Sequence, residues 1–125
     1  QSYLDGTSVF TFGISQTPRA IRQLLERSGI NGEDIDYYIF HQANMLMNEK
    51  IREKLGLDVN KVPYVLRDFG NTSSTSIPLT MINNLKENLR EQPLRLACCG
   101  FGVGLSWGAV TFCTDGVVCP DLIEL

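Results

Sequence analysis

The stretch IFHQANMLMNEKIREKLG, residues 39–56, decides the fold because it joins a short apolar run to an amphipathic helix. The run from Tyr37 to Phe40 is aromatic-rich and too short for a helix, which predicts a buried strand. Apolar residues then recur among charged ones over 43–55, which predicts a helix that ends at Gly56. His41, the single histidine of the chain, therefore lies where a strand gives way to a helix.

The segment upstream predicts one more strand and one more helix. Alternating apolar residues after a turn predict a strand near 8–14. Thr17 followed by Pro18 is typical of a helix start, and the helical spacing of the apolar residues continues to Ser28.

Downstream, the chain continues to alternate extended and helical pieces. An extended piece is expected around 62–66, and Ser76 predicts the start of a third helix. Two strand-like runs, 94–99 and 105–113, flank a glycine-rich turn and predict a hairpin. The order of these elements predicts an α/β protein with a mixed five-stranded sheet covered by helices.

Composition places the chain among soluble globular proteins of one domain, with 43% apolar and 20% charged residues. A net charge of -3 without a basic cluster argues against nucleic-acid binding. No apolar run has the roughly 20 residues of a membrane span, and the first residues lack the features of a signal peptide. We expect a cytoplasmic domain over 1–114 and a disordered or appended tail over 115–125.

The cysteines show neither metal-ligand spacing nor a secreted disulfide pattern. Cys98 and Cys99 are adjacent in an apolar run, no Cys-x-x-Cys pair occurs, and His41 is distant in sequence. We therefore predict buried reduced thiols and no metal or organic cofactor.

Three features lie where a strand ends or a helix begins, which is where sites form in α/β sheets. They are His41, Asn71 in a Gly-Asn turn, and the loop from Gly100 to Gly104. Each also has a structural explanation. A histidine at a strand end often serves as a hydrogen-bonding residue, an asparagine suits a turn, and a glycine run suits a bulged hairpin.

The sequence resembles the C-terminal half of β-ketoacyl-acyl-carrier-protein synthase III. The motifs HQAN at 41–44, FGNTSSTSIP at 69–78 and GFGVGLSWG at 100–108 occur in the family's order and spacing. DGTSVFTFGIS, residues 5–15, matches the strand that opens that half. The resemblance implies one half of a thiolase-like fold, in which the cysteine nucleophile belongs to the other half. The chain alone is then expected to be inactive.

The resemblance assigns catalytic roles to His41 and Asn71, whose N–H groups would stabilise the enolate formed when a malonyl thioester loses CO₂. Neutral donors suit this task because each can lower the barrier by about 3 kcal/mol in a dry site. The family's oxyanion loop falls on Gly102, Val103 and Gly104, with Val103 replacing a usual glycine.

The same resemblance places the pantetheine arm of the substrate beside a second set of residues. They are Asn44, Ala43, Gly6, Thr7 and Phe10. Leu46 stands where some members carry an arginine that docks the carrier protein, which leaves a specialised pathway open.

The implied partners are an acyl-CoA, malonyl-acyl-carrier protein, the N-terminal half and a second copy in a homodimer. Three other hypotheses stay open. The chain is a relative of thiolases or hydroxymethylglutaryl-CoA synthases, a binding half-domain without chemistry of its own, or a hydrolase that pairs Cys98 or Cys99 with His41.

Overall fold

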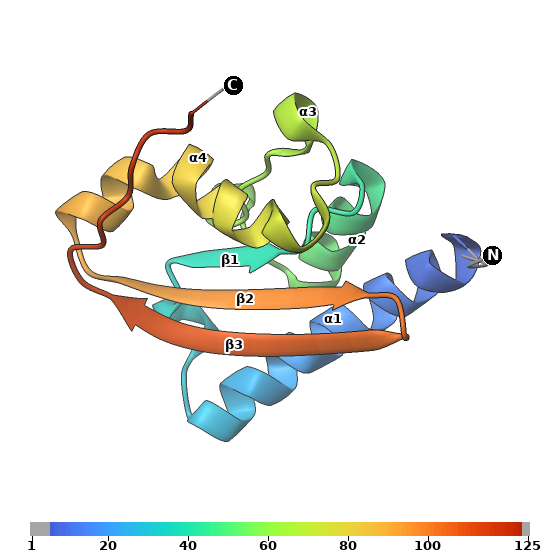
Figure 1. Ribbon diagram of the computed structural model, residues 1–125. Coiled ribbons are helices and arrows are strands. Elements are labelled where there is room, and N and C mark those ends of the chain that lie inside the picture. The colour runs from blue at the N-terminus through green and yellow to red at the C-terminus, as the bar shows by residue number, and fades with distance from the viewer. Residues whose placement is uncertain (1–5, 124–125) are drawn as a thin grey trace.

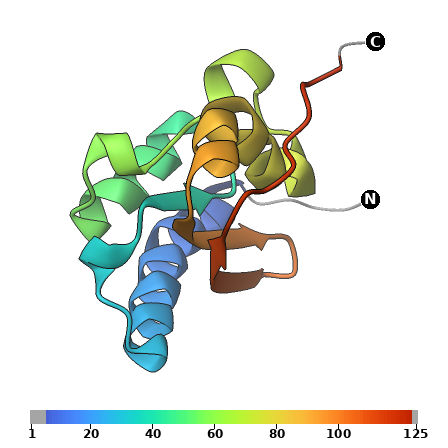
Figure 2. The same ribbon diagram turned by 90° about the vertical axis from the view of Figure 1, so that its left-hand side faces the viewer.

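The computed structural model describes residues 6–123, which form a three-stranded sheet with helices on both faces (Figures 1 and 2). Helix α4 lies over one face of the sheet, and α1 lies over the other with α2 packed beside it. The first five residues of the domain predicted for 1–114 lie outside the described residues. The elements in chain order are α1 Gly6–Ser28, β1 Tyr37–Phe40, α2 Met45–Leu55, α3 Leu66–Phe69, α4 Ser76–Glu91, β2 Leu94–Gly102 and β3 Ser106–Thr114, with 3-10 turns η1 Gly32–Asp34, η2 Val59–Lys61 and η3 Ser73–Thr75.

The sheet is mixed, as predicted, with β2 in the centre. β1 pairs parallel to β2 from Tyr37 opposite Leu96 to Phe40 opposite Cys99. β3 runs back antiparallel to β2 after a turn at 103–105, which confirms the predicted hairpin. Because β1 and β2 run in the same direction, their carboxyl ends meet at one edge of the sheet.

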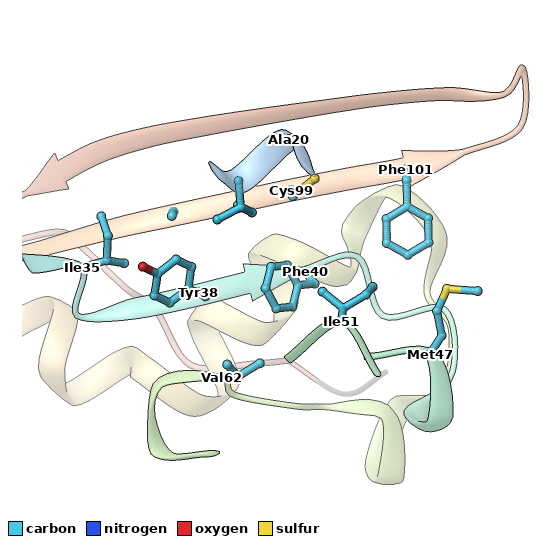
Figure 3. Packing of buried hydrophobic residues seen from close by; sticks show 11 residues of the cluster. Ala20, Ile35, Tyr38, Phe40, Met47, Ile51, Val62, Cys99 and Phe101 are labelled. Atoms are coloured by element: carbon cyan, nitrogen blue, oxygen red, sulfur yellow. The ribbon is translucent and has the colours of Figure 1, made fainter. Parts of the chain in front are cut away.

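The core has two parts, one on each face of the sheet. Alternate residues of the strands point to opposite faces, so Phe40 and Cys99 pack against α1 and α2 while Ile39 and Cys98 pack against α4. Figure 3 shows the first part, which includes Ala20, Ile35, Tyr38, Phe40, Met47, Ile51, Val62, Cys99 and Phe101. In the described part of the chain no helix is long and apolar enough to cross a membrane.

The strand predicted near 8–14 is wrong, because these residues belong to α1. Gly13, Thr17, Ala20 and Ile21 are buried, and Thr17 lies four residues from both Gly13 and Ile21 and three from Ala20, which places the four on one face of the helix. The helix comes close to the sheet and α2 at Gly13, where a Cβ atom would lie 2.8 Å from Met47 Sδ. Close packing of a helix against the sheet overrides the local alternation of apolar residues.

Pro18 lies inside α1 rather than at its start, so the predicted helix boundary is also wrong. A proline within a helix leaves the carbonyl four residues earlier without its N–H partner. Here that carbonyl belongs to Ile14, and Lys54 Nζ of α2 donates to it at 3.1 Å. A contact between two helices thus compensates for the missing bond and allows the helix to continue.

The extended piece predicted around 62–66 forms no strand, and Leu66 begins the short helix α3. With 8–14 in a helix as well, the described residues hold three strands instead of the five predicted. The 62–65 segment is instead held by a buried side chain, since Val65 N–H donates to Gln42 Oε1 at 3.3 Å.

The tail predicted as disordered or appended runs along α4 as far as it is described, to residue 123 (Figure 1). Val117 N–H donates to Leu89 O at 3.1 Å, and Cys119 is buried in the core on the α4 face. Arg90 bonds to the Cys119 carbonyl, and Lys86 pairs with Asp121. Residues 124–125 lie outside the described residues.

Candidate functional site

A pocket of about 630 Å³ opens at the edge of the sheet where β1 and β2 end. Its lining comes from α1, the β1–α2 loop, the 70–76 loop, the start of α4 and the end of β2. The motifs at 41–44 and 69–78 supply the polar side chains of the pocket, and the glycine-rich motif at 100–108 supplies part of its wall. The residues that matter most for the chemistry are His41, Asn71, Ser76, Phe101, Gly102 and Val103.

His41 is held at both its backbone and its side chain. Its N–H donates to Cys99 O at 2.9 Å, which continues the β1–β2 ladder by one residue. Its ring nitrogen Nδ1 lies 2.9 Å from Ser76 Oγ, and the ring of Phe101 lies nearly perpendicular to the imidazole, with 5.2 Å between the centroids. With Nδ1 occupied, Nε2 is the ring nitrogen that remains for a ligand.

Partial burial lowers the pKa of His41 below its usual 6.5, and the nearby Ser73 carbonyl opposes the shift. The ring is therefore neutral at neutral pH, as a hydrogen-bond donor without fixed charge must be.

Asn71 follows Gly70, whose φ of +64° is strained for other residues. The side-chain oxygen Oδ1 accepts the Ser73 N–H at 2.9 Å, so the turn role considered for this residue is real. The same bond orients the side chain and leaves the amide hydrogens of Nδ2 as its donors. Asn71 therefore closes a turn and lines the pocket at once.

A second pocket of about 420 Å³ adjoins the first and shares Ala43 and Asn71 with it. Asn44 lines this second pocket while its Oδ1 accepts from Met47 N–H at 2.8 Å and caps α2. Arg67 of α3 is the charged residue among the described residues that line it.

The glycine-rich loop contributes its first half to the site. Gly102 and Val103 line the first pocket, and Val103 is exposed. Gly104 has a φ of +136° and makes the hairpin turn without being among the described lining residues. Its role is conformational, since a side chain at this φ is strained.

The three candidates near the N-terminus lie in α1 and outside the described lining of both pockets. Gly6 and Thr7 form the exposed first turn of this helix, and Phe10 packs against the core. Val9 is the residue of that turn that reaches the first pocket. The helical conformation of this segment, which the alternation did not predict, explains the difference.

Sequence reasoning missed two residues that shape the site. The sequence predicts a helix start at Ser76, whose side chain also bonds to His41. It predicts a hairpin around Phe101, whose ring also packs on the histidine. No sequence signal points to this role of Ser76, because it lies 35 residues from His41 in the chain and its own motif, FGNTSSTSIP, indicates a turn and a helix start.

None of the four cysteines is among the described residues that line the pocket. Cys98 and Cys99 are buried on opposite faces of the sheet, and burial raises their pKa values to about 12 and about 11. A thiol with so high a pKa is a poor nucleophile near neutral pH. These observations count against a hydrolase complete within this chain.

Solved structures with the same arrangement define the class of protein. A 3-oxoacyl-(acyl-carrier protein) synthase from Burkholderia xenovorans superposes with a TM-score of 0.93 and 35% identity, over 98% of this chain and 35% of that one. The β-ketoacyl synthase III of Thermus thermophilus gives a TM-score of 0.85 and 31% identity, over 92% and 36%. The chain has one half of the thiolase-like α/β fold, as expected.

Residues 25–113 match the family of 3-oxoacyl-[acyl-carrier-protein] synthase III C-terminal regions. A β-ketoacyl-[acyl-carrier-protein] synthase III of Halalkalibacterium halodurans is 39% identical over 107 residues, which are 86% of this chain and 34% of the relative. The corresponding enzyme of Lactococcus lactis is 36% identical over 107 residues, 84% of this chain and 33% of the relative. The chain belongs to this family and spans about a third of the length of these relatives.

Proposed function

We propose that this chain is the half of a β-ketoacyl-acyl-carrier-protein synthase III that activates the malonyl thioester. The reaction is a decarboxylative Claisen condensation: the malonyl unit loses CO₂, the enolate carbon bonds to the carbonyl of an acyl group held as a thioester on a cysteine, and the cysteine leaves as the thiolate. In this scheme the chain supplies the enolate donors, and an N-terminal half supplies the cysteine.

The observation that carries the proposal is the convergence of His41 and Asn71 on one pocket. They lie thirty residues apart in the chain, on a strand end and a loop, yet both line the same cavity. Each is held by one hydrogen bond that leaves N–H groups for a ligand. Two neutral donors in one pocket favour decarboxylation, because both can donate to the enolate oxygen as its negative charge develops.

The backbone of the glycine-rich loop is the second donor group in the proposal. Gly102 and Val103 line the pocket, and a backbone N–H of this loop can hold the oxyanion that forms at the acyl carbonyl. The valine side chain is exposed, so its replacement of the family's glycine leaves the backbone donor in place.

The charge at the second pocket supports an anionic carrier for the malonyl group. Leu46 cannot bind an anion, and Arg52 is paired with Glu49 at 2.7 Å. Arg67 lines the second pocket beside Asn44. We propose that it faces the acidic carrier protein or the phosphate of its arm, and that the enzyme acts as a cytoplasmic homodimer on an acyl-CoA and malonyl-acyl-carrier protein.

The experiment compares wild-type, His41→Ala and Asn71→Ala chains, each assembled with an N-terminal half that carries the cysteine. We expect each substitution to lower the rate of malonyl decarboxylation at least about 100-fold, from the loss of one oxyanion donor. Transfer of the acyl group to the cysteine should continue in both variants, because that step needs neither donor.

A matched control is Asn83→Ala, which removes the same side-chain amide as Asn71→Ala from an exposed residue of α4 that lines neither pocket. Its decarboxylation rate should stay within about twofold of wild type, in line with a surface substitution. Decarboxylation that survives in both the His41 and Asn71 variants would leave this chain with the family's fold and without the proposed chemistry.

A further inference from the structure

Ser76, the first residue of α4, contacts two groups with one hydroxyl. Its Oγ lies 3.1 Å from the Gln42 backbone N–H and 2.9 Å from His41 Nδ1. We propose that this hydroxyl is the positioning group that holds His41 as the tautomer with its hydrogen on Nε2, the nitrogen left for the substrate.

The hydrogens available to Ser76, Gln42 and His41 determine the direction of both hydrogen bonds. A backbone N–H always donates, so Oγ is the acceptor in its bond to Gln42. The hydroxyl has one hydrogen of its own, and Nδ1 is the partner in reach that can accept it. A ring that accepts at Nδ1 carries its hydrogen on Nε2.

Burial strengthens this arrangement because water cannot substitute for either partner. Ser76 and Gln42 are both fully buried. The Gln42 side chain is itself anchored, with Nε2 donating to Phe40 O at 2.8 Å and Oε1 accepting from Val65 N–H. The backbone N–H that directs the hydroxyl therefore has little freedom, and neither does the hydroxyl.

No charged side chain of the described pocket lining competes with the hydrogen bond between Ser76 and His41. Among the described residues that line the pocket, His41 is the single titratable side chain. Phe101 offers the ring no charge and no hydrogen-bond acceptor, and the Ser73 carbonyl is a competing acceptor beside the ring. In the opposite tautomer Nδ1–H would donate to Oγ, and the hydroxyl hydrogen would lose Nδ1 as its acceptor.

The catalytic consequence rests on the proposed function. An Nε2–H is the donor that an enolate oxygen in the pocket requires, and the wrong tautomer would present a lone pair to a negative charge. Ser76 then acts on the reaction through His41, as a positioning residue.

The single histidine of the chain makes a direct test possible. A long-range ¹H–¹⁵N correlation spectrum of the labelled chain at about pH 8 shows one imidazole, whose nitrogen shifts report the tautomer. We expect a protonated Nε2 and an unprotonated Nδ1. A spectrum with the hydrogen on Nδ1 overturns the proposal.

The change in the pKa of His41 in Ser76→Ala shows which group donates the hydrogen bond, because the two directions predict shifts of opposite sign. A hydroxyl that donates to Nδ1 stabilises the neutral ring, so its removal should raise the pKa by about half a unit. A hydroxyl that accepts from Nδ1–H stabilises the charged ring, and its removal would lower the pKa.

Three further variants keep this test decisive. Ser76→Cys keeps the size of the side chain with a weak donor and should raise the pKa even if Ser76→Ala does not fold. Ser76→Thr retains the hydroxyl and should restore the wild-type pKa. Ser74→Ala should leave it unchanged. An unchanged or lowered pKa in the Ala and Cys variants contradicts the proposal.

Activity distinguishes this proposal from the proposed function. In the assembled enzyme, Ser76→Ala should lower kcat for decarboxylation about tenfold with little change in KM, and Ser76→Thr should recover it. A wild-type kcat in Ser76→Ala, in an enzyme that needs His41, contradicts the role. If the pKa shifts as expected while His41→Ala still decarboxylates, the bond stands and the proposed function fails.

Discussion

The ring of His41 is half-buried, and its protonation state decides what the pocket can bind. A neutral ring donates one hydrogen bond without attracting anions indiscriminately, whereas an imidazolium would pair with any carboxylate. The pocket favours the neutral form because partial burial removes water from the charged form, against the opposing effect of the Ser73 carbonyl.

This preference predicts that stability depends on pH through His41. The folded-state pKa lies below the value near 6.5 of the unfolded chain, so the unfolded chain binds the proton more readily in between. The contribution of the ring to stability is therefore complete above about pH 6.5 and is lost as the pH falls through the folded-state pKa. Urea unfolding at about pH 7.5 and pH 5.5 measures this loss.

His41→Gln is the control, because glutamine does not titrate over this range. Its free energy of unfolding should fall less than that of wild type between the two pH values. Equal losses in the two proteins would show that His41 has the same pKa folded and unfolded.

The sequence predicted where His41 and Asn71 lie relative to strands and loops, because such positions follow from local patterns. It could not predict the bond from His41 to Ser76, since 35 residues separate them and α4 must pack on the sheet before they meet. For the same reason, the motif containing Ser76 indicated a helix start and nothing about the histidine.

At the scale of elements, α1 shows the limit of local patterns most clearly. Residues 8–14 alternate as a strand does, and Thr17-Pro18 is a typical helix start. The helix forms through both because small residues let it approach the sheet and Lys54 satisfies the Ile14 carbonyl. Neither condition is visible in a window of ten residues, whereas β1, α4 and the hairpin were predicted because their signals are local.

The tail offers a prediction for a second element. Cys119 is buried against α4, whereas its neighbour Val118 is 91% exposed. Cys119→Ala should destabilise the chain by about 1 kcal/mol through lost burial, and Val118→Ala should change it by less than about 0.5 kcal/mol.

Chemical denaturation of the two variants measures the difference. Equal stabilities would mean that burial of the Cys119 side chain does not stabilise the fold, in line with a domain that ends at 114. A clear difference would extend the domain into the tail.

At the scale of the whole molecule, apolar side chains remain exposed along β3. Val110 is 51% exposed and Phe112 is 37% exposed, and they border a groove of about 390 Å³ with Ile77 and Met81 of α4. Soluble monomers seldom expose such a surface without a partner. The chain spans a third of its relatives, and an uncovered face is what a part of a larger fold should present.

We therefore expect the 125-residue chain to self-associate on its own. Val110→Lys combined with Phe112→Lys places two charges in the groove and should shift the chain toward a monomer, as measured by analytical ultracentrifugation. Val118→Lys adds a charge on the tail, at a position 91% exposed, and should leave the association unchanged. A monomeric wild-type chain at high concentration would contradict the expectation.

The two residues proposed as donors, His41 and Asn71, are held in different ways. The His41 amide extends the β1–β2 ladder, so its hydrogen can exchange with solvent only when the sheet opens. Asn71 sits in a loop between two positions with positive φ, Gly70 and Ser73, outside that ladder. Amide exchange should therefore be slow at His41 and fast around Asn71. Under the proposed function, any adjustment of the pocket to a bound substrate would then occur on the Asn71 side, against a histidine that stays fixed.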